Sequence, residues 1–125
     1  MNTEYLLNRL YEIPQLIAHE QKDLLSKNRD FQEISNKILI VESGIRAQIA
    51  VAADSSGKKL YSNDDARKTA FIEHCQENLE LSNLISDKTK ISESMDLIKI
   101  DIELLSNEQR NIRTILSFTS QNTLN

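Results

Sequence analysis

Cys75 is the single cysteine of the chain, and it directly follows His74, one of two histidines. A nucleophilic cysteine needs a base within hydrogen-bond reach, but neighbouring side chains on a helix point about 100° apart. A zinc site needs more ligands than one cysteine and one histidine supply at this spacing. We therefore interpret Cys75 as a small core residue and His74 as a solvated one.

Acidic side chains are the other candidates for chemistry. The pairs Asp101/Glu103 and Asp64/Asp65 lack the Glu/His pattern that builds di-iron sites in helical bundles. The sequence also contains no phosphate-binding loop, dinucleotide-binding motif or nucleophile elbow. We expect no catalytic residue, no metal and no cofactor, and therefore a protein that is not an enzyme.

Five of the 15 basic residues gather around one turn, with a tyrosine among them. These candidate contact residues are Arg46, Lys58, Lys59, Tyr61, Arg67 and Lys68. Cations interleaved with an aromatic ring can hold single-stranded nucleic acid or an acidic protein partner. Asp54, Asp64 and Asp65 offset much of this charge, so the solubility of an exposed turn is the alternative explanation.

A seam of apolar residues at alternating spacings of three and four follows both halves of the chain, which is typical of helices packed on helices. In the first half it comprises Leu10, Ile13, Ile17, Leu24, Phe31, Ile34, Ile38, Val41 and Ile45, with Glu20 and Lys27 at two polar positions. In the second half it comprises Ile91, Met95, Ile98, Ile102, Leu105, Ile112 and Leu116. The seam predicts an all-α fold: one domain over residues 1–125 that forms an antiparallel helical hairpin, a coiled coil with Leu10 opposite Leu105.

Few residues can interrupt these helices. Pro14 predicts a kink between a short helix at about 3–12 and a long one at about 15–50. The run from Asp54 to Gly57 predicts a turn at about 53–62, with Gly57 in a left-handed conformation. Apolar residues also alternate with period two before the turn, so residues 45–61 form either a helix end plus loop or a tiny β-ribbon of 48–52 against 59–61.

The second long helix is expected at about 63–118, with Ser62 or Asn63 as its cap, followed by a frayed tail at 119–125. Near its start the seam moves sideways onto Leu79, Cys75, Ile72 and Phe71. Such a shift predicts a stutter, a local change of supercoil, rather than a break in the helix.

Apolar residues also lie beside the seam, where a single partner helix cannot cover them. They are Leu7, Leu16, Leu25 and Leu39 in the first half, and Ile85, Leu97, Ile100 and Leu104 in the second. Because so wide a stripe suits a bundle of several helices, we expect the chain to associate with itself as a dimer or higher helical bundle. Leu97, Ile100 and Leu104 are the candidate interface.

Composition restricts the class of protein further. With 2 Gly and 1 Pro, the chain has too few turn formers for a β-sandwich or a nucleotide-binding α/β fold. A net charge of −4 disfavours a non-specific DNA coat, and no apolar run reaches the roughly 18 residues of a membrane span. A lone cysteine favours a reducing compartment, so we expect a cytoplasmic protein without a membrane partner.

The segment Gly57-Lys58-Lys59-Leu60-Tyr61-Ser62-Asn63-Asp64-Asp65-Ala66-Arg67-Lys68 resembles the "GK-x-x-[YF]-[ST]-N-x-x-x-R" stretch of small coiled-coil proteins from phages and integrated mobile elements. The helix from Ile102 to Arg113 is similar to their later helix, so the resemblance covers about half of the chain. These proteins are often encoded beside recombination and single-strand-binding proteins. The resemblance implies an accessory role in DNA processing and carries over no catalytic residue.

Two hypotheses for function follow. In the first, the chain is an oligomeric coiled-coil interaction protein, a scaffold, adaptor or inhibitor that binds a protein partner. In the second, it is an accessory nucleic-acid-binding factor in DNA recombination or processing that uses the basic turn.

Overall fold

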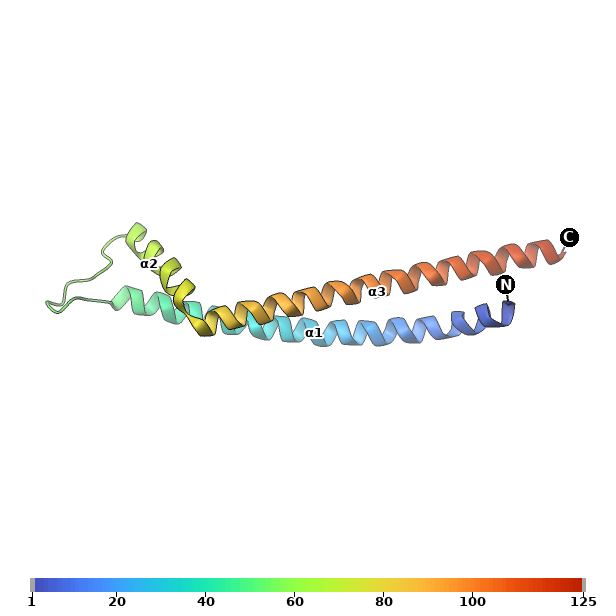
Figure 1. The fold of residues 1–125 in the computed structure, drawn as a ribbon, viewed down its shortest axis with the longest axis horizontal. Helices are drawn as coiled ribbons and strands as arrows, with labels where there is room; N and C mark the ends of the chain where they lie inside the picture. Colours follow the sequence, from blue (N-terminus) through green and yellow to red (C-terminus); the bar gives the residue numbers. More distant parts are fainter. Residues whose placement is uncertain (1, 125) are drawn as a thin grey trace. The chain divides into compact units, whose positions relative to one another are not determined.

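The computed structural model describes residues 2–124, with side chains for residues 2–121. This range contains three helices and no strand: α1 (Thr3–Val51), α2 (Asp64–Glu77) and α3 (Leu79–Leu124) (Figure 1). The predicted all-α fold class is therefore confirmed. The chain packs as two compact units: unit 1 holds the residues up to Arg29 together with those from Glu93 onward, and unit 2 is Asp30–Ser92.

The prediction of a separate short helix before Pro14 was wrong, because α1 continues through this proline. A proline inside a helix removes one backbone hydrogen bond and crowds the preceding turn, at a cost of about 3 kcal/mol. The side chains around it supply compensating packing. Leu6 and Ile13 are buried against Ile112 of α3, and Ile13 is fully shielded from solvent. Tertiary packing thus keeps the helix continuous where local preference alone would end it.

The single helix predicted for residues 63–118 is two helices, divided at Asn78. Asn78 has an extended backbone, with φ −81° and ψ 110°, and its N–H donates to the Cys75 carbonyl at 3.3 Å. Its side-chain Oδ1 accepts the N–H of Leu81 at 2.8 Å, as an N-cap residue does. One asparagine therefore ends α2 and begins α3, and the predicted stutter is a break.

The break changes which side chains of α2 and of the start of α3 are buried. Leu79 and Ile72, which the shifted seam would place inside, are 74% and 55% exposed. Ala70, which lies outside that seam, is only 2% exposed and belongs to the core. Phe71 is half-buried, so the seam predicted from the sequence holds for this part of α2 only in part.

The C-terminal end also differs from the expectation, because α3 extends to Leu124 where a frayed tail was predicted from residue 119. The Thr119 hydroxyl donates to the Ile115 carbonyl at 2.9 Å, a bond that helical geometry permits. The last residue of that predicted tail, Asn125, lies outside the described residues.

The connection between α1 and α2 is a turn centred on Gly57, whose φ of 85° confirms the predicted left-handed conformation. Asp54 organises it, because its carboxylate accepts the Ser56 hydroxyl at 2.6 Å and the Lys58 N–H at 3.0 Å. These bonds, that of the Ser56 hydroxyl foremost, lower the pKa of Asp54. Of the two alternatives for this region, the helix end is correct: α1 reaches Val51, and only an isolated bridge joins Ala53 to Lys59.

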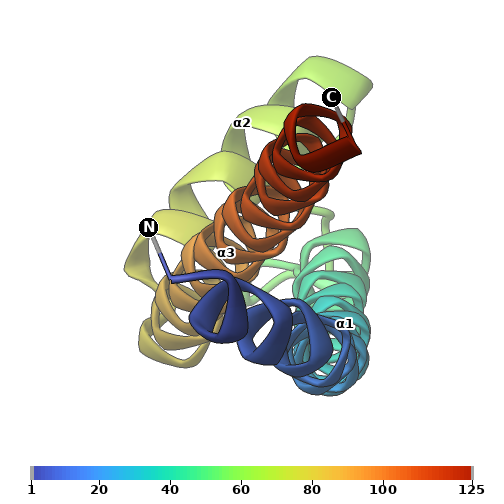
Figure 2. The same ribbon diagram turned by 90° about the vertical axis from the view of Figure 1, so that its right-hand side faces the viewer.

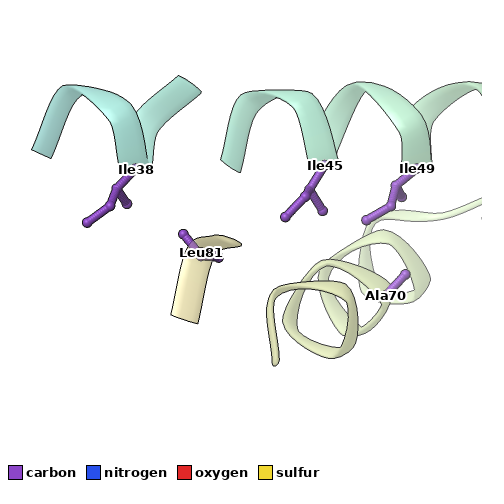
Figure 3. Packing of buried hydrophobic residues seen from close by; sticks show 5 residues of the cluster. All are labelled: Ile38, Ile45, Ile49, Ala70 and Leu81. Atoms are coloured by element: carbon purple, nitrogen blue, oxygen red, sulfur yellow. The ribbon is translucent and has the colours of Figure 1, made fainter. Parts of the chain in front are cut away.

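Unit 2 has its own core, in which α1 packs against α2 and the first turns of α3. Ile38, Ile45 and Ile49 point from one face of α1 toward Leu81 of α3 and Ala70 of α2 (Figure 3). Ile38 and Ile45 belong to the predicted seam of the first half, which is buried or half-buried throughout, and Ile49 lies one turn beyond its predicted end. Asn63 caps α2 by accepting the Ala66 N–H at 2.8 Å, as one of the two predicted capping residues.

Unit 1 joins the first part of α1 to the last part of α3, whose ends face the viewer in Figure 2. Leu6, Ile13 and Ile112 form its buried centre. Beside them the Arg9 guanidinium holds Glu108 through two hydrogen bonds, of 2.6 and 2.9 Å. The predicted antiparallel pairing would bring Arg9 opposite Ser106, so the observed partner lies two residues further along α3.

Candidate functional site

A groove of about 480 Å³ lies on unit 2, and three of the predicted contact residues line it. Its floor and sides are apolar, and its polar lining consists of cations. The lining residues are Arg46 and Ile49 from α1, and Arg67, Lys68, Phe71 and Ile72 from α2. The site therefore combines an aliphatic and aromatic surface with three positive charges and no carboxylate in its lining.

Arg46 is held over an aromatic ring. Its guanidinium carbon lies 4.2 Å from the centroid of the Phe71 ring, a cation–π arrangement. No carboxylate within ion-pair distance neutralises Arg46 in the described part of the chain. The ring thus orients this charge beside the groove and leaves it available to a ligand.

Arg67 has a structural role as well. It donates to Asp64 at 2.5 Å and to the Tyr61 carbonyl at 3.3 Å, so it joins the first turn of α2 to the chain before it. Asp64 offsets most of its charge. Lys68, by contrast, is exposed and makes no ion pair among residues 2–121, so Lys68 and Arg46 carry the uncompensated charge of the groove.

The other predicted contact residues lie outside the groove. Lys58 and Lys59 are exposed on the turn, where Lys59 forms the bridge to Ala53. Tyr61 is half-buried and packs against the core of unit 2. Its ring therefore supports the fold rather than offering a flat surface to a nucleic-acid base.

The charge around this site is balanced over a longer stretch. Residues 42–73 contain five basic and five acidic side chains. Binding to a phosphate backbone depends on the number of cations that replace counterions, and a balanced segment gains little from that effect. The groove is suited to short-range recognition of an apolar surface that carries a few negative charges.

Cys75 lies in the same unit, half-buried against its core. Burial, followed by the negative charge of Glu42, raises the pKa of its thiol, against a smaller opposing effect of Arg46. A nucleophilic cysteine requires a lowered pKa, so this environment disfavours the thiolate at neutral pH. Among the described residues, no group of three histidine, cysteine or acidic side chains is placed to hold a metal ion.

The second candidate surface lies on α3 in unit 1. Leu97, Ile100 and Leu104 are 65%, 50% and 60% exposed, as expected for residues beside the seam, whereas Ile98 of the seam is 6% exposed. Their spacing of three and four places them on one face of the helix. We call these three residues the α3 stripe.

A third surface was missed by the sequence reasoning. Arg110, Arg113 and Phe118 line a hollow of about 420 Å³ near the end of α3. Phe118 is 65% exposed. The sequence did contain a signal for this surface, since Arg110 and Arg113 are three residues apart and lie on one face of the predicted helix.

Comparison with protein-family models, with curated proteins and with solved structures finds no match to this chain. Within the described residues, no helix is both long enough and apolar enough to cross a membrane.

Proposed function

We propose that this chain is a non-enzymatic helical interaction protein that associates with itself and acts as a scaffold, adaptor or inhibitor for a protein partner. In each unit, parts of α1 and α3 pack along the heptad seam in opposite directions, as in a helical hairpin that is a two-stranded coiled coil. The buried positions support this arrangement: the seam is shielded, including half-buried Glu20 and Lys27, while the residues beside it are exposed.

The α3 stripe carries the proposal. Monomeric proteins rarely keep several large aliphatic side chains together on one exposed helical face, because burying each one against a partner is favourable. Leu7, Leu16 and Leu25 of α1 add further exposed leucines in the same unit. A helical bundle of two or more copies would cover both sets.

Sedimentation equilibrium at tens of micromolar tests the proposal on the wild type and on the double variant Ile100→Glu/Leu104→Glu. We expect an oligomer for the wild type and a folded monomer for the variant, because two carboxylates would be buried without partners. Lys99→Glu is the matched control, since it changes the net charge by the same amount at an exposed position of α3. A monomeric wild type would refute the proposal.

The resemblance to coiled-coil proteins of phages and mobile elements implies an accessory role in DNA processing. It therefore keeps an accessory nucleic-acid function as the second candidate, for which Arg46, Lys68 and Phe71 in one groove are the favouring observation. Salt-dependent binding of an oligothymidylate that requires Arg46 and Lys68 would favour that second candidate.

A further inference from the structure

We infer that the groove of unit 2 receives the α3 stripe of a second copy of this chain. The inference deepens the proposed self-association, on which it rests, by naming the two surfaces that meet. It comes from a complementarity between them in both apolar character and charge.

The groove contributes the basic half of this contact. Ile49, Phe71 and Ile72 form its apolar lining, and Ile72 is 55% exposed. Arg46 and Lys68 border it without a carboxylate partner in the described chain, and Arg67 adds a charge shared with Asp64. An occupant should therefore present aliphatic side chains flanked by negative charges.

The α3 stripe is flanked by such charges. Glu93 lies one turn before Leu97, and Asp96 and Asp101 lie on the two sides of the stripe, each three or four residues from one of its members. All three acids are exposed, and none of them forms an ion pair in the part of the chain that the structure describes. Three aliphatic side chains with three free carboxylates thus match an apolar groove with three cations.

An amphipathic helix in a hydrophobic groove commonly uses anchors at positions i, i+3 and i+7. Leu97, Ile100 and Leu104 have this spacing. The match favours a protein helix over a nucleic acid, because the groove is largely apolar and the charges around it are balanced. Each copy carries both a groove and an α3 stripe. The contact is heterologous, because the groove of one copy meets the stripe of another.

Charge reversal tests the inference without disturbing the core. The groove variant is Arg46→Glu/Lys68→Glu, and the stripe variant is Asp96→Lys/Asp101→Lys; all four positions are exposed. Lys58→Glu/Lys59→Glu is the matched control, with the same charge change outside the groove. Circular dichroism confirms that each variant is helical before sedimentation equilibrium measures its assembly.

We expect self-association to weaken at least tenfold in the groove variant and in the stripe variant, and to remain in the control. The variant with all four reversals should recover it. A mixture of the groove variant and the stripe variant should form a one-to-one complex, because each supplies the intact surface that the other lacks. If the groove of each copy held the α3 stripe of the same copy, the mixture would form no such complex.

Two results would overturn the inference while leaving self-association intact. In one, the groove variant assembles like the wild type although Ile100→Glu/Leu104→Glu does not. In the other, the groove variant loses binding to a fluorescent oligothymidylate with unchanged assembly, which would assign the groove to single-stranded nucleic acid. A wild type that is monomeric at tens of micromolar would refute both the proposed function and this inference.

Discussion

Replacing Asn78 with alanine should destabilise the protein through the start of α3. The Asn78 side chain accepts the N–H of Leu81 at 2.8 Å, and Leu81 is 2% exposed. Water has little access to that N–H once the cap is removed, so it would be left without a partner. Loss of an N-cap usually costs about 0.5–2 kcal/mol, and the burial of Leu81 places Asn78→Ala in the upper part, about 1–2 kcal/mol.

Urea unfolding followed by circular dichroism measures this effect. Asn78→Asp and Asn78→Ser should remain near the wild type, because both side chains can accept the same bond. Asn83→Ala is the matched control: the same exchange on an exposed position of α3 should leave stability unchanged or raise it by a few tenths of a kcal/mol. If Asn78→Ala were as stable as Asn83→Ala, the capping role of Asn78 would be wrong.

Four further substitutions probe the turn, α1 and the core of unit 1. Gly57→Val should lower the free energy of unfolding by about 1 kcal/mol or more, because valine is strained at the positive φ of this position. Gly44→Ala should raise the free energy of unfolding by roughly 0.5–1 kcal/mol, because Gly44 lies inside α1 with open space around it. Thermal melts compare the two variants. Hydrogen bonds from Arg9 hold the pKa of Glu108 below its ordinary value of 4.5, so their stabilisation is present above that pH and is lost as the pH falls through the lowered pKa. As the pH is lowered, the urea midpoint of unfolding should therefore fall less for Glu108→Gln than for the wild type. Ile13→Ala should cost about 2–5 kcal/mol, and a change below 1 kcal/mol would show that this site is not a packed core in solution.

The seam and its flanks could be predicted from the sequence because burial on a helix follows its period. Leu97 beside the seam is exposed, and Ile98 within it is buried, as the spacing requires. The turn at Gly57 could also be predicted, because a glycine that follows Asp-Ser-Ser is a strong turn signal in a chain with so few turn-forming residues.

Pro14 and Asn78 show where the sequence misleads. The helix-breaking tendency of Pro14 is local, and the packing of Ile13 on a helix about 100 residues away in the chain outweighs it. In the sequence, Asn78 is one polar residue among many in a helical pattern. In the structure it is half-buried, and its extended backbone and its capping bond to Leu81 reveal the break. The groove depends on that break, because it exists where α2 leaves the course of α3 and lies against Ile49, so the sequence could supply its cations but not its shape.

The energetics of association indicate why charge should decide the outcome at the α3 stripe. Full burial of a leucine or isoleucine contributes about 1.5–3 kcal/mol, and these three side chains are already partly covered, so completing their burial yields roughly 3–5 kcal/mol. Association costs an estimated 4–15 kcal/mol in lost freedom. The stripe alone is therefore close to the threshold, and the apolar groove surface, with Ile72 exposed, must contribute a comparable amount for micromolar assembly. Exposed ion pairs add only about 0.2–1 kcal/mol each, but reversing two of them replaces attraction by repulsion of similar size. When association is this close to the threshold, a change of about 2 kcal/mol in its free energy separates an oligomer from a monomer. Charge reversals at Lys68 and Asp101 should therefore prevent assembly as effectively as replacing Ile100 and Leu104.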